Sequence, residues 1–124
     1  MPAPETLPGI RVVAHPAALD RAVWPAGCLA MRIAPDDVFA IGADAVEIDD
    51  PHAIIESESM FSGVWLDRSF VEDWIVHNAE WRLPDRDGVS QGMVAALPVK
   101  VLVQGARALV TVPASFAHEL ESRL

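Results

Sequence analysis

Few side chains in this chain could do chemistry, and their spacing matches no common catalytic or metal-binding motif. The 124 residues include four histidines, one cysteine and no tyrosine. Zinc sites need three or four convergent ligands, often spaced as C-x-x-C or H-E-x-x-H, and the sequence contains neither spacing. The G-x-S-x-G, Walker and G-x-G-x-x-G motifs are missing too. We therefore predict no catalytic residue, no metal site and no nucleotide site.

Two local groupings have both a chemical and a structural interpretation. Glu56 and Glu58 are separated by one residue, so a strand would place both carboxylates on one face. Like charges so placed can bind a cation or shift a pKa, but an exposed strand face is the commoner explanation. His77 falls on the same helical stripe as Trp74 and Trp81, and we expect a half-buried imidazole there rather than a metal ligand.

The charge of the chain narrows the choice of partner. Eighteen acidic and nine basic side chains give a net charge of −9, with the acidic residues concentrated in the first half. Such a surface repels phosphate backbones and anionic lipids, so nucleic acid and membranes are not expected partners. The acidic surface is either a solvated face or an electrostatic docking face, and the first is the commoner case.

The hydropathy and cysteine content predict a cytoplasmic protein with one core. The hydrophobic content of 52% is ample for a core, and no apolar run approaches the ~18 residues that span a bilayer. The start, Met1 to Glu5, lacks the basic flank and apolar segment of a secretory signal. Cys28 has no partner for an internal disulfide, and we expect it to be a small buried side chain.

Turn and strand patterns predict one α+β domain at 9–124, preceded by a flexible arm at 1–8 that holds three prolines. Residues 28–34 and 38–42 read as a hairpin around Pro35-Asp36-Asp37. Further strands are expected at 9–14 and 107–113 and within the apolar run 89–103, which only Pro98 interrupts. The extended stretch 53–66 is expected to form two strand pieces, because Ser57-Glu58-Ser59 and Gly63 suggest a bend or bulge. The expected architecture is a mostly antiparallel sheet of five to six strands with two amphipathic helices packed on one face.

The stronger helix is predicted at 69–81. Ser69 and Glu72 form a capping-box pattern, with Asp67 as an alternative cap. Phe70 and Trp74 centre the apolar stripe of this helix, so both should be buried against the sheet. A second helix is expected from about Ser115, with Phe116, Leu120 and Leu124 on its apolar side.

Several segments resemble the gamma subunit of heterotetrameric sarcosine oxidase. R-I-A-P-D-D-V-F-A-I-G at 32–42 is similar to the family pattern L-x-P-D-E-x-L-x-x-G, and P-A-S-F-A at 113–117 is similar to its P-x-S-F-A helix start. Residues 55–60 correspond to the family's D-x-S-H-G segment, with an acidic residue but without the histidine. The resemblance covers 28–124 and extends, more distantly, to the folate-dependent aminomethyltransferase domain.

The resemblance implies a non-catalytic subunit that works through protein contacts in one-carbon metabolism. Its partners would be the flavoprotein or folate-binding subunits of a sarcosine-oxidase-like complex, which carry the chemistry. Two alternatives remain: a stand-alone homodimeric binding module, and a small domain that itself binds tetrahydrofolate, although no cofactor is expected. The segment from Phe61 to Trp65 is the candidate interface, because tryptophan is enriched at interface anchors.

Overall fold

The computed structural model describes residues 2–124, which form seven strands and three α-helices. The strands are β1 (Glu5–Val13), β2 (Leu29–Ala34), β3 (Asp37–Ile41), β4 (Ile54–Asp67), β5 (Gly88–Val94), β6 (Leu97–Gln104) and β7 (Arg107–Pro113). The helices are α1 (Pro16–Arg21), α2 (Arg68–Asn78) and α3 (Ala117–Arg123), the last preceded by a 3-10 turn, η1 (Ala114–Phe116). Neighbouring strands follow the order β2-β3-β1-β4-β7-β6-β5. The chain divides into two compact units, 7–59 and the remainder.

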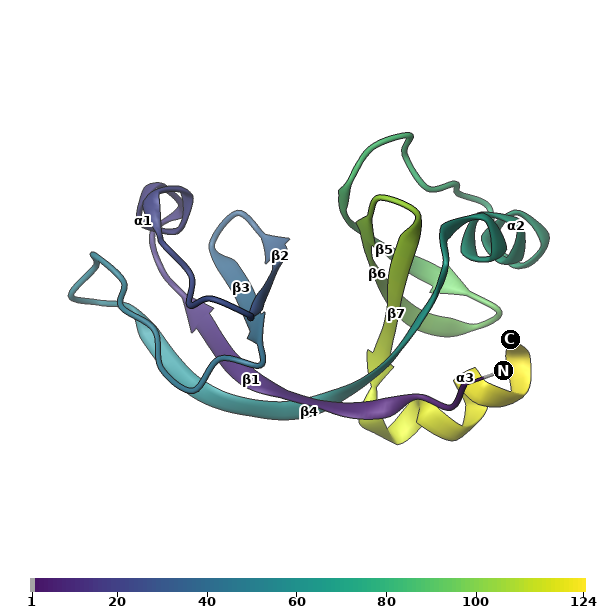
Figure 1. The fold of residues 1–124 in the computed structure, drawn as a ribbon, viewed down its shortest axis with the longest axis horizontal. Coiled ribbons are helices and arrows are strands. Elements are labelled where there is room, and N and C mark those ends of the chain that lie inside the picture. The colour runs from purple at the N-terminus through teal and green to yellow at the C-terminus, as the bar shows by residue number, and fades with distance from the viewer. Residues whose placement is uncertain (1) are drawn as a thin grey trace. The chain divides into compact units, whose positions relative to one another are not determined.

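The unit at 7–59 is built on the predicted hairpin, which the structure confirms. β2 and β3 pair antiparallel, and β3 pairs antiparallel with β1 on its other side. Alternate residues of β1 and β3 point into a small core together with Leu19 of α1; the buried strand residues are Ile10, Val12, Val38 and Ala40. Figure 1 shows α1 beside these strands. Phe39 and Ile41 of β3 are buried as well, so alternation decides which side chains join this core, and both faces of β3 are covered.

The unit that contains 60–124 is a sheet covered by helices on one face (Figure 1). β4 pairs antiparallel with β7, β7 with β6, and β6 with β5. One face of this sheet carries a dense layer of valine and leucine side chains: Val64, Leu66, Val99, Val101, Val103, Val110 and Val112. Trp74 and Ile75 of α2 and Leu120 of α3 pack against that layer.

The expected fold of five to six strands with two helices is wrong. The chain has seven strands, because the apolar run 89–103 folds back on itself as β5 and β6. It also has a third, short helix, α1, which begins at Pro16, where proline favours a helix start. Its turn is Ala95-Ala96, where both residues have positive φ angles of 50° and 65°. Alanine rarely adopts this conformation, so the sequence carried no hairpin signal. Pro98 does not break β6, since it lies beyond the last β6–β7 pair, Lys100 with Thr111.

Replacing Ala96 with glycine should stabilise the protein. A two-residue turn with positive φ at both positions is type I′, which favours glycine at the second position. Relief of the left-handed strain exceeds the conformational entropy that glycine adds to the unfolded chain, so we expect Ala96→Gly to raise the free energy of unfolding by about 0.5–1 kcal/mol. Urea denaturation would measure it.

Ala106 provides the matched control. It is exposed, like Ala96, and occupies the two-residue turn between β6 and β7, where only Gly105 has a positive φ. Ala106→Gly should therefore lower stability, by about 0.5–1 kcal/mol, through chain entropy alone. Equal effects of the two substitutions would show that the strain at Ala96 is not significant.

Several expected boundaries also differ. β4 is one continuous strand, Ile54–Asp67, so the expected split of this stretch is wrong. β1 begins at Glu5, so Glu5–Pro8 is strand where we expected an arm; Met1 lies outside the described residues. The N-cap of α2 is Asp67 rather than Ser69, and its side chain makes no capping hydrogen bond. α2 ends at Asn78, so Trp81 is not on its stripe; the Trp81 Nε1 donates to the Met93 carbonyl at 3.0 Å.

The predicted burial of Trp74 is confirmed, since only 7% of the residue is exposed. The same prediction for Phe70 is wrong, because Phe70 is 38% exposed. The expected half-buried His77 is also wrong: its side chain is 70% exposed, and its Nδ1 lies 2.7 Å from the Asp73 carbonyl. The buried face of α2 consists instead of Val71, Trp74 and Ile75. The helix is therefore rotated slightly away from the stripe that Phe70 and His77 defined.

Candidate protein interface

The unit at 7–59 is strongly acidic, with nine carboxylates and three arginines. Arg11 on β1 forms a side-on pair with Asp37 on β3, at 2.5 Å from Nε to Oδ1 and 2.7 Å from Nη2 to Oδ2. Its Nη1 also donates to Glu58 on β4 at 3.1 Å. The bond to Asp37, aided by Glu58, raises the pKa of Arg11 above its ordinary value. One guanidinium on β1 therefore pairs with carboxylates on two other strands, β3 and β4.

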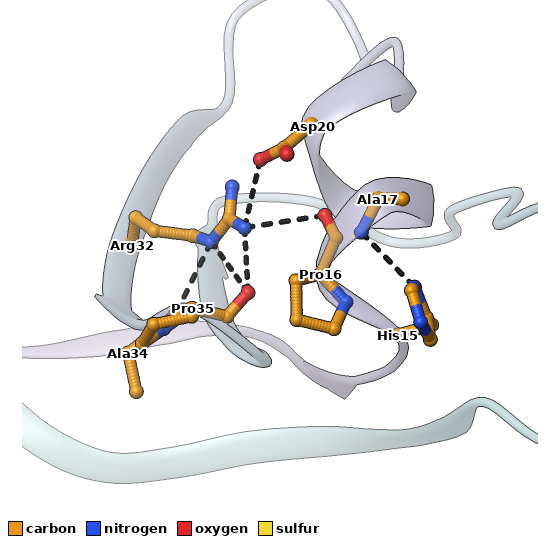
Figure 2. A network of polar contacts seen from close by, with 7 residues as sticks. All are labelled: His15, Pro16, Ala17, Asp20, Arg32, Ala34 and Pro35. Atoms are coloured by element: carbon orange, nitrogen blue, oxygen red, sulfur yellow. Dashed lines mark hydrogen bonds and ion pairs between the residues drawn. The ribbon is translucent and has the colours of Figure 1, made fainter.

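The other two arginines also pair with carboxylates inside the unit. Figure 2 shows Arg32 of β2 reaching across to α1, where its Nη2 donates to Asp20 at 2.9 Å. The same guanidinium donates to the carbonyls of Ala34 and Pro35, which hold it in the β2–β3 turn. Arg21 lies 3.7 Å from Asp49, and both side chains are exposed. No arginine of this unit is thus left to neutralise the other acidic groups.

Five carboxylates of the unit are not paired with an arginine in the described structure: Asp36, Asp44, Glu47, Asp50 and Glu56. Asp50 accepts hydrogen bonds from the backbone N–H groups of His15 and His52, each at 2.9 Å. These bonds favour the ionised form and lower the pKa of Asp50. The surface of 7–59 therefore favours a positively charged partner.

The first half of β4 adds exposed apolar side chains to this acidic surface. Ile54 is 57% exposed and Ile55 is 44% exposed. Neighbouring residues of a strand point to opposite faces, so both faces of β4 are uncovered here. Glu56, Ser57 and Ser59 are exposed as well. Solvent-exposed isoleucines on both faces of a strand are typical of a protein–protein interaction surface.

Glu56 and Glu58, which share one face of β4, are not equivalent. Glu58 is largely covered, with 15% of its side chain exposed, and it is bonded to Arg11. Glu56 is exposed and has no ion pair among the described residues. Of these two carboxylates, only Glu56 is therefore accessible for an ion pair with another molecule.

The sequence-predicted interface residues lie further along β4. Phe61 is only 9% exposed, and the Nζ of Lys100 lies 5.5 Å from the centre of its ring. Trp65 is half-buried. Neither is an exposed anchor in this structure. The exposed pair Ile54-Ile55 was overlooked, although two adjacent isoleucines after a turn cannot both be buried by a sheet that is covered on one face.

The remaining candidate groups do not converge. Cys28, expected to be buried, is half-buried and has a free thiol. A hollow of about 320 Å³ in 7–59 is lined by residues 8–10, 42–44 and 57–59, of which only Asp44 and Glu58 are ionisable. Among residues 2–124, no group of three or more histidine, cysteine, aspartate or glutamate side chains could hold a metal ion. Within the same residues, none of the helices has the length and apolarity needed to cross a membrane.

Comparison with known proteins identifies no relative of this chain. The chain matches no protein-family model, no curated protein and no solved structure.

Proposed function

We propose that this chain is a non-catalytic binding subunit that docks onto a positively charged partner protein through the surface of 7–59. One observation supports it above the others: exposed Ile54 and Ile55 lie within a unit where carboxylates outnumber arginines three to one. Apolar contacts at such a surface supply affinity, and complementary charge supplies orientation and a faster encounter.

The resemblance to sarcosine oxidase gamma chains suggests what the partner would be. In this proposal the partner is a flavoprotein or folate-binding subunit of a sarcosine-oxidase-like complex, and that partner carries out the chemistry. The cytoplasm is the proposed compartment, where a lone thiol such as Cys28 stays reduced. The isolated chain should then show no turnover of sarcosine in the presence of tetrahydrofolate.

Native co-purification with quantitative mass spectrometry tests the proposal. Ile55→Glu should reduce recovery of the partner at least about tenfold, because it places a charge at the centre of the apolar contact. Val76→Glu is the matched control, since Val76 is 43% exposed but lies on α2, outside 7–59. Raising the salt concentration should weaken the wild-type complex.

A partner recovered equally with Ile55→Glu and wild type would overturn the proposed surface. Symmetric dimers of the purified chain, with no other chain recovered, would favour the homodimer instead. A melting curve that tetrahydrofolate shifts upward would favour the small folate-binding domain.

A further inference from the structure

The hydrogen-bond pattern of β4 fixes which of its backbone groups face β7. In an antiparallel pair, residues bonded to the partner alternate with residues that point away from it. The Arg68 N–H donates to the Ala106 carbonyl at 2.8 Å, directly beyond the register pair of Asp67 with Arg107. Even-numbered residues of β4 therefore turn their N–H and C=O groups towards β7, and odd-numbered residues turn theirs towards β1.

The first residues of β4 extend past the end of β7. The last pair in their register is Phe61 with Pro113, after which the chain leaves the strand as η1. Ile54 and Glu56 precede Phe61 and continue the even-numbered series along the same strand. Their N–H and C=O groups point to the edge that β7 does not reach. Their side chains are exposed too, so this edge is accessible to another chain.

We propose that an extended, basic segment of the partner protein adds to β4 as a strand along Ile54–Glu56, with a lysine or arginine opposite Glu56. This inference rests on the proposed function and gives it a binding mode. Strand addition takes its affinity from main-chain hydrogen bonds and its specificity from alternate side chains. Opposite charges directly across a strand pair stabilise it, and Glu56 has no ion pair in the described structure.

A second copy of this chain is a poorer occupant of the same edge. Antiparallel self-pairing centred on Glu56 would bring two Glu56 side chains directly opposite each other. Like charges in that position destabilise a sheet. Each of the three arginines of this unit is already paired with a carboxylate, so the unit offers little compensating positive charge.

Amide hydrogen exchange followed by NMR tests the binding mode. In the free chain the Glu56 amide should exchange much faster than the Ser57 amide, because only Ser57 points towards β1. The probe is an amidated seven-residue peptide that alternates lysine and valine. It should slow exchange at Glu56 at least about tenfold and leave Ser57 unchanged, whereas a peptide that alternates glutamate and valine should have no effect.

Two substitutions at one position separate charge from main-chain pairing. Glu56→Gln keeps the N–H and should weaken binding of the lysine peptide several-fold. Glu56→Pro removes an N–H that faces the open edge, so it should abolish binding while the bonds to β1 and the unfolding midpoint are retained. Glu56→Lys should reverse the preference between the two peptides.

Three results would overturn strand addition. Lysine-peptide binding without protection at Glu56 would mean side-chain docking, which leaves the proposed function intact. Protection at Ser57 instead would mean that the alternation along β4 is shifted. Protection of Glu56 that grows with protein concentration in the absence of peptide would identify a second copy as the occupant.

Discussion

Trp74→Ala should lower the free energy of unfolding by about 3–5 kcal/mol, the usual loss for a core aromatic residue. Trp74 is 7% exposed and packs within the valine-rich layer of β4, β6 and β7. Its Nε1 donates to the Arg123 carbonyl at 2.7 Å, so this hydrogen bond also stabilises the C-terminal end of α3. The substitution leaves a cavity and an unpaired carbonyl. Urea unfolding followed by circular dichroism would measure the loss.

Two companion variants separate packing from hydrogen bonding. Trp74→Phe keeps most of the buried surface and removes only the N–H donor, so it should cost about 1–2 kcal/mol. Phe70→Ala acts on the same helix at a residue that is 38% exposed, and it should cost about 1 kcal/mol or less. Equal losses for Phe70→Ala and Trp74→Ala would contradict the observed orientation of α2.

Gly9→Ala should be unusually destabilising for the addition of one methyl group. A Cβ at Gly9 would lie 2.3 Å from the Ala40 carbonyl oxygen and 2.9 Å from Cε1 of Phe39. The oxygen belongs to β3, which pairs with β1 at this point, so the clash is relieved only if the two strands separate. We expect a loss of about 3 kcal/mol, the upper end of the range for overpacking. Thermal and urea unfolding would both report it.

Gly92→Ala is the matched control for that clash. A Cβ there would lie 2.6 Å from Nε1 of Trp81, which is a side-chain atom rather than backbone. The indole can swing aside, at the cost of its hydrogen bond to the Met93 carbonyl. The loss should be about 1 kcal/mol, with a shifted Trp81 indole N–H resonance. If Gly92→Ala costs as much as Gly9→Ala, the close approach of β1 and β3 is not what limits position 9.

The proposed interface depends on acidic charge and on an open strand edge. The sequence alone reveals the charge but not the edge. The excess of acidic residues in the first half is visible in the sequence, and so is the choice between a solvated face and a docking face. The pairing of Arg11 with Asp37 and Glu58 is not visible in the sequence, because the two partners are 26 and 47 positions away from Arg11. That pairing covers Glu58 and leaves Glu56 as the charged group on the edge.

The sequence by itself determined the features that local chemistry controls. Pro35-Asp36 specified the β2–β3 turn, and the alternation in β2 specified the strand before it. Burial of Trp74 followed from helical periodicity, because that residue lies at the centre of the apolar side of α2. Each of these depends on residues within a few positions of one another.

Only the tertiary structure decided the strand count and the edge of β4. The Ala95-Ala96 turn has an unfavourable local conformation, and it is held by distant groups: the Ala95 N–H donates to the Asn78 carbonyl, and Arg123 donates to the Ala95 carbonyl. No residue near β4 indicates that β7 ends opposite Phe61. Strand ends and turn strain are set by contacts far apart in the chain, and local propensity does not encode them.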